Sequence, residues 1–129
     1  MKWLLMNKDI VPGTARFFGK GGMRADSISR HLLVDLTAYN PDILVIQLGG
    51  NDISATSSPN YIFQTLIRLQ MDLYNAGIKE VYFAGIVPRG HFGKSPGLTA
   101  TSFEKQRNKI NQLMMTRLNY IKLRVKLYY

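Results

Sequence analysis

The sequence predicts an α/β protein, a three-layer α/β/α sandwich in which a parallel sheet has helices on both sides. Two short, nearly continuous apolar segments, 43–48 and 81–87, are typical of buried strands. Segments with apolar residues at helical spacing alternate with them. Such alternation indicates parallel strands, because a parallel connection needs a crossover that is usually a helix. At 129 residues, the chain fits a single domain spanning 1–129.

The expected elements alternate along the chain between strand and helix. They are a strand at 15–19, a helix at about 26–39, a strand at 43–48, a helix from 58 to 77, a strand at 81–87, a helix from 101 to about 118, and a strand at 121–127.

Capping and stop residues mark the ends of the helices. Pro41 makes it unfavourable for the first helix to continue past residue 40. Ser58 suits the N-cap of the second helix, and Gly77 suits its C-terminal stop. Thr101 and Glu104 have the spacing of a capping box, which predicts the start of the third helix.

The expected parallel arrangement of the strands predicts where a ligand would bind. The segment 43–48 is apolar except for Gln47, so we expect both of its faces to be covered. The segment 121–127 alternates apolar and basic residues, as edge strands do. In open parallel sheets the ligand crevice lies at the carboxyl ends of the strands. Loops 19–24, 49–54 and 88–95 are expected to meet there.

The charge balance allows an anionic partner. The chain has 17 basic and 8 acidic residues, and seven of the basic residues lie between Lys105 and Lys126. This field could attract nucleic acid, although a solvated basic face is the favoured explanation. The apolar run at the start is too short for a signal peptide, and no segment reaches the ~20 apolar residues of a membrane span. These features favour an intracellular protein without a membrane partner.

Polar residues follow the strand at 43–48 directly. The carboxamide of Asn51 is a neutral donor suited to an oxygen atom that gains negative charge. Asp52 can accept backbone N–H groups and hold the turn in shape. Gly22 lies before a helix, where a backbone N–H favours an anion. Ordinary turn chemistry also prefers Gly, Asn and Asp at such places, and this alternative stays open.

Two of these segments resemble conserved blocks of the SGNH, or GDSL-like, hydrolases. "ILVIQLGGNDIS" (43–54) is similar to the block whose Gly-x-Asn-Asp motif supplies an oxyanion-hole asparagine, and "FGKGGMRADSI" (18–28) is similar to the block whose glycine N–H is a second donor. The resemblance implies a flavodoxin-like sandwich and hydrolysis of a small ester or acyl substrate through a serine. It assigns Gly22 and Asn51 to the oxyanion hole and makes Asp52 the supporting acid.

The family pattern is incomplete in this chain. A Gly-Asp-Ser block should precede Gly22 by a strand and a helix, but only 21 residues precede Gly22 and none is a serine. An Asp-x-x-His block should follow the last strand, and the sequence ends at Tyr129. We therefore expect no nucleophile, no activity from this chain alone, and association through exposed sheet edges. A non-catalytic basic interaction module on the same fold is the alternative.

Few other residues suggest chemistry. Arg89 and His91 lie in the third crevice loop and are candidates for the rim of a substrate site. His31 falls within a predicted helix and is expected at the surface. No spacing of His, Asp or Glu suggests a metal, and no phosphate-binding or dinucleotide motif is complete, so we expect no cofactor.

Overall fold

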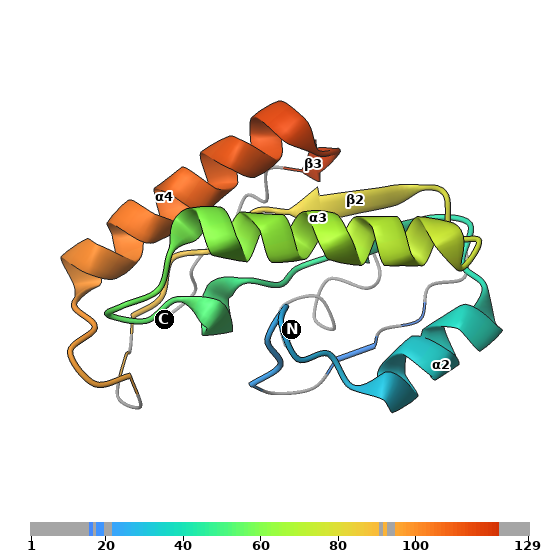
Figure 1. Ribbon diagram of the computed structural model, residues 1–129, viewed down its shortest axis with the longest axis horizontal. Coiled ribbons are helices and arrows are strands. Elements are labelled where there is room, and N and C mark those ends of the chain that lie inside the picture. Colours follow the sequence, from blue (N-terminus) through green and yellow to red (C-terminus); the bar gives the residue numbers. More distant parts are fainter. Residues whose placement is uncertain (1–15, 17, 20–21, 91, 93–94, 122–129) are drawn as a thin grey trace.

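A computed structural model describes residues 16, 18–19, 22–90, 92 and 95–121. The elements in chain order are α2 (Arg30–Tyr39), β1 (Leu44–Ile46), the 3₁₀ helix η2 (Gly50–Asp52), α3 (Pro59–Asn75), β2 (Val81–Ala84), α4 (Ala100–Arg117) and β3 (Tyr120–Ile121). Figure 1 shows α3 alongside β2, with α4 and α2 on opposite sides of the view.

The described strands form a parallel sheet in the order β1-β2-β3. Val45 is paired with Tyr82, and Phe83 with Tyr120. Helices separate successive strands, so the chain has the α/β class that the sequence predicts. Because right-handed crossovers between successive neighbours fall on one face, α3 and α4 share a face of the sheet, where they pack against each other.

The core lies where α3, α4 and the sheet meet. Leu66 of α3, Phe83 of β2, and Ile110 and Met114 of α4 are fully buried there. Burying an apolar side chain of this size stabilises a fold by roughly 1.5–3 kcal/mol. Buried residues recur every three or four positions along both helices, and this periodicity made the helices predictable. They are Ile62, Leu66, Leu69 and Leu73 in α3, and Phe103, Gln106, Ile110 and Met114 in α4.

The start of α3 was predicted correctly and the start of α4 was not. Ser58 Oγ accepts a hydrogen bond from the Tyr61 backbone N–H (3.3 Å), as an N-cap does. In α4 the N-cap is Thr99, whose Oγ1 accepts from the Ser102 N–H (3.1 Å). The predicted capping box at Thr101 and Glu104 is therefore wrong. Both residues lie inside the helix, and Glu104 instead forms an ion pair with Arg107 (2.8 Å).

Several elements are shorter than expected. Residues 16, 18 and 19 of the predicted first strand are not in a strand, and the first helix begins at Arg30 rather than near residue 26. Residues 122–127 of the predicted last strand lie outside the described residues. Within the described chain, β1 pairs with β2 alone, so its other edge is open.

The strand β1 is also less covered than predicted. Val45 is 43% exposed and Ile43 is 56% exposed, because the described helices α3 and α4 cover the opposite face. Beside β1 lies an apolar cavity of about 80 Å³, to which α2 contributes Leu32, Leu33 and Leu36. Only part of the apolar surface of β1 is therefore buried by the described chain.

Candidate functional site

A tight turn ends the first strand and presents the candidate residues. Gly49 follows β1 with φ of +112°, a conformation that favours glycine. A Cβ at this position would lie 3.0 Å from Ile86 Cδ1, so a larger residue would also push the Ile86 side chain aside. The backbone then closes into η2, in which the Asp52 N–H donates to the Gly49 carbonyl (3.1 Å).

Asp52 joins this turn to the glycine loop. Its side chain is only 5% exposed, and its Oδ2 accepts the backbone N–H of Ala25 (2.9 Å). Arg24 Nε lies 3.7 Å from Oδ1. Burial raises the pKa of Asp52, and the Ala25 hydrogen bond and the Arg24 charge act in the opposite direction. Asp52 thus holds residues 24–25 and 49–52 together across 27 positions of sequence.

Asn51 is exposed and has a partner at each end of its carboxamide. Its Nδ2 donates to the Met23 carbonyl (3.0 Å), and its Oδ1 accepts from Arg89 Nη2 (3.0 Å). A carbonyl can only accept and a guanidinium can only donate, so the two partners together determine which end of the amide faces the glycine loop. One of the two Nδ2 hydrogens is left for another acceptor.

Gly22 directly precedes Met23, whose carbonyl accepts the hydrogen bond from Asn51. It is exposed, and its φ of +73° lies in the left-handed region. No described heavy atom lies within 4 Å of a Cβ built at this position. In the described part of the chain, no acceptor takes the Gly22 N–H. Gly22 and Asn51 are both exposed, and the Asn51 carboxamide bonds the residue that directly follows Gly22.

Arg89 is the predicted rim residue that reaches the site. Its guanidinium bonds Asn51 and stacks on the ring of Phe103, with Cζ 5.1 Å from the ring centroid. Phe92 packs against the same ring at 5.3 Å between centroids. His91, the other predicted rim residue, lies outside the described residues.

Sequence reasoning missed Asn111 and Arg107, which bind the backbone of the segment that leads to Arg89. Asn111 of α4 accepts from the Ile86 N–H through Oδ1 (2.8 Å) and donates to the Ile86 carbonyl through Nδ2 (3.0 Å). Arg107 Nη1 donates to the same carbonyl (2.9 Å). These side chains hold the backbone just beyond β2, three residues before Arg89. The sequence signal that could have revealed Asn111 and Arg107 is that both polar residues lie beside the apolar stripe of the predicted helix.

The described hydroxyl groups near the site are bound to other partners. Ser57 Oγ lies within hydrogen-bonding distance of Gln106 Oε1 and of the Ser54 carbonyl, and it has a single hydrogen to donate to one of them. Gln106 Nε2 donates to the Ser54 carbonyl (2.8 Å). His31 is exposed on α2, as predicted. Across the described residues, no group of three or more His, Asp or Glu side chains could hold a metal ion. None of the helices in the described chain is long and apolar enough to cross a membrane.

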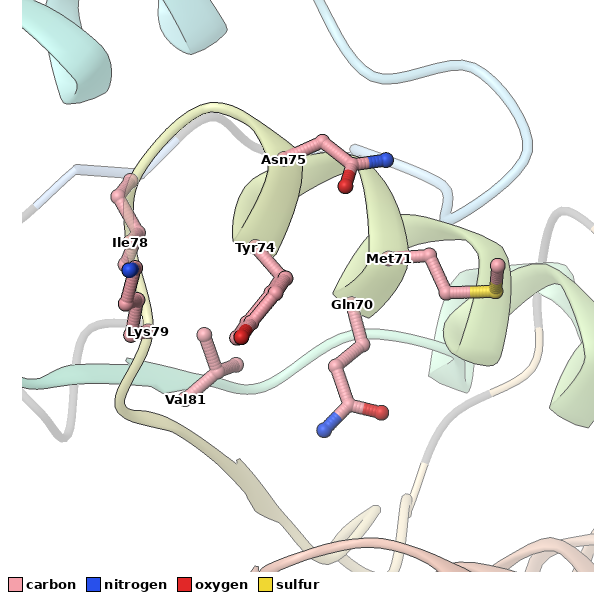
Figure 2. A pocket seen from close by; sticks show the side chains of 7 residues that line it. All are labelled: Gln70, Met71, Tyr74, Asn75, Ile78, Lys79 and Val81. Atoms are coloured by element: carbon pink, nitrogen blue, oxygen red, sulfur yellow. The ribbon is translucent and has the colours of Figure 1, made fainter.

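A hollow of about 240 Å³ lies at the other end of β2, away from Asn51. Figure 2 shows its lining, which α3, the loop after it and the start of β2 supply: Gln70, Met71, Tyr74, Asn75, Ile78, Lys79 and Val81. Ile78 and Val81 are buried, whereas Met71 and Tyr74 are more than half exposed. Nothing in the predicted chemistry uses this hollow.

Comparison with known proteins adds no relative. No protein-family model, curated protein or solved structure matches this chain.

Proposed function

We propose that this chain carries the oxyanion-binding part of an SGNH-type ester or acyl hydrolase on a flavodoxin-like, three-layer sandwich. In this proposal the Gly22 N–H and the Asn51 carboxamide bind the oxyanion, and Asp52 supports them. Arg89 and His91 lie at the rim. No hydroxyl among the described residues is paired with a base, and we expect that the chain does not hydrolyse esters by itself.

The observation that supports this proposal is the hydrogen bond from Asn51 Nδ2 to the Met23 carbonyl. It brings a carboxamide with one uncommitted N–H next to Gly22, whose own N–H has no described acceptor. Two donors that converge on one oxygen atom are what a developing oxyanion requires. Asp52 keeps the two loops together through its bond to Ala25.

Acetate tests the proposed site, because a carboxylate presents an oxyanion without needing a nucleophile. In ¹⁵N-resolved NMR spectra at constant ionic strength, the Gly22 N–H and the Asn51 side-chain NH₂ should both shift on titration with acetate. They should give the same dissociation constant. The exposed side-chain NH₂ of Asn75, at the end of α3, is the matched control and should not shift.

The variant Asn51→Ala should abolish the acetate-dependent shift of Gly22. If Gly22 and Asn51 do not shift, or titrate with different constants, the two donors do not form one site and the proposal is wrong.

An aryl ester tests the absence of turnover. We expect the chain to hydrolyse such an ester no faster than buffer does. Turnover that falls by ~10²–10³ in Asn51→Ala, the usual loss for one oxyanion donor, would contradict the proposed inactivity while supporting the oxyanion site.

A basic interaction module remains a second candidate function because of α4. Lys105 and Lys109 are exposed one turn apart, and no described carboxylate forms an ion pair with either. Single-stranded RNA should then bind with an affinity that falls as salt rises. Replacing both lysines with glutamine should reduce the salt slope by about 0.7 for each lost phosphate contact. Absence of binding, or binding that salt does not weaken, excludes this function.

A further inference from the structure

The guanidinium of Arg89 occupies a place shaped to receive it. One face lies on the ring of Phe103, which is buried in the core. A Cβ at Gly50 would lie 3.3 Å from Arg89 Nη2, so the absence of a side chain at Gly50 lets the guanidinium approach the turn. Nη2 then donates to Asn51 Oδ1 at 3.0 Å. A cation stacked on a ring and bonded at its edge is held in one orientation.

This orientation has a consequence for the amide. A carboxamide can present either its oxygen or its NH₂ group to a neighbour, and rotation by half a turn exchanges them. Arg89 excludes the exchanged state, because that state would set the guanidinium against NH₂ and the Met23 carbonyl against Oδ1. The positive charge of the guanidinium beside Oδ1 also polarises the amide, which makes its N–H groups stronger donors.

We propose that Arg89 is a positioning residue for Asn51: it locks the carboxamide with its NH₂ group toward Gly22 and strengthens that group as a donor to a carboxylate or similar oxyanion. The inference deepens the proposed function and rests on it, because the oxyanion site is the one proposed above. Arg89 acts through Asn51 and does not itself contact the bound oxygen.

The test compares variants by NMR, first without ligand. In Arg89→Met, which removes the donors and keeps the length of the side chain, the two Asn51 Nδ2 proton resonances should move toward those of the solvent-exposed Asn75 pair. Arg68→Met removes one positive charge from an exposed position on α3 and is the matched control. It should leave the Asn51 resonances unchanged. An Asn51 pair that does not move in Arg89→Met overturns the proposal, whether or not acetate binds.

Acetate affinity then separates positioning from simple charge. Arg89→Met should weaken acetate binding at Gly22 about tenfold, as the loss of a charged hydrogen bond would. Arg89→Lys keeps the charge but lacks the planar fork, and should weaken binding to a similar extent. Full affinity in Arg89→Lys means that charge alone matters, which overturns the positioning role.

Gly50→Ala provides a variant in which Arg89 itself is intact. The added methyl group pushes against Nη2, so acetate should bind more weakly although every charge remains. Backbone amide spectra show for each variant that the fold persists. If the wild-type chain shows no acetate shift at all, the proposed function fails, whereas normal acetate binding in Arg89→Met refutes only the role of Arg89.

Discussion

At the scale of single residues, Asp52 contributes a buried charge that holds two loops together. Burial raises its pKa above the ordinary carboxyl value of 3.8, because a charge is poorly solvated there. The folded chain therefore holds this proton more tightly than the unfolded chain does. Stability from this group is present below 3.8 and decreases as pH rises through the raised pKa.

Asp52→Asn should remove this pH dependence. The wild-type free energy of unfolding minus that of the variant should fall as pH rises from below 3.8 through the raised pKa. Asp26, whose pKa is lowered by its hydrogen bond from Arg24, acts in the opposite direction and cancels in the difference. Urea denaturation at a series of pH values measures the effect. A difference that rises with pH would contradict the raised pKa.

Gly49 is the second residue on which the turn depends. Gly49→Ala places a Cβ 3.0 Å from Ile86 Cδ1 in a backbone conformation with positive φ. We expect a loss of about 1–2 kcal/mol or more in the free energy of unfolding. Gly90→Ala is the control: a Cβ there meets no described atom within 4 Å, and the effect should stay within about 0.5 kcal/mol. Equal effects in the two variants would contradict the steric argument.

At the scale of elements, α4 fixes the chain that leaves β2. The carboxamide of Asn111 pairs with both the N–H and the carbonyl of Ile86, as a neighbouring strand would. Ile86 is buried, so its backbone groups need such a partner. This arrangement connects the packing of α4 to the place of Arg89 three residues later.

Asn111→Ala should leave the buried Ile86 N–H without an acceptor and cost about 1–3 kcal/mol of unfolding free energy. Asn108→Ala changes the same residue type on an exposed side of α4 and should cost no more than about 0.5 kcal/mol beyond its propensity effect. Thermal or urea denaturation compares the two variants. If the Asn111 variant is as stable as the Asn108 variant, the contact to Ile86 carries little energy.

The helix starts show where local sequence signals are ambiguous. Ser58 precedes a proline at the first helical position, and the two signals agree with the observed start of α3. Before α4, Thr99 and Thr101 can both serve as caps, and Glu104 three residues after Thr101 favours the wrong one. Thr99 is the N-cap, and Glu104 pairs with Arg107, three positions further along the helix, instead of with Thr101. Local spacing alone does not decide between two such candidates.

At the scale of the whole molecule, β1 leaves an open edge in the described sheet. Val45 of β1 and Ile43 just before it are large, apolar and about half exposed, on the face of the sheet opposite α3 and α4. Open, uncharged strand edges are sites of association between chains. The sequence predicts that copies of the chain associate through an exposed sheet edge. The open edge of β1 is where this prediction can be tested.

Val45→Lys should reduce this association, because a charge on an edge strand disfavours pairing with another chain. Sedimentation velocity over a range of concentrations should show less oligomer than the wild type, and the thermal transition should depend less on concentration. Met115→Lys is the control, since it adds the same charge at another exposed apolar residue, on α4. An equal reduction in both variants would mean that net charge, not the edge, controls association.

The sequence by itself determined the α/β class, the stripes of α3 and α4, the cap at Ser58 and the turn after β1. Each of these follows from local periodicity or from residues with restricted backbone preferences. Only the tertiary structure decided that Asp52 bonds Ala25, that Asn51 faces Met23, and that Arg89 meets Asn51 across 38 positions of sequence. Such contacts join residues far apart in the chain, so no local pattern encodes them; they form only when the folded chain brings the three loops to the same place.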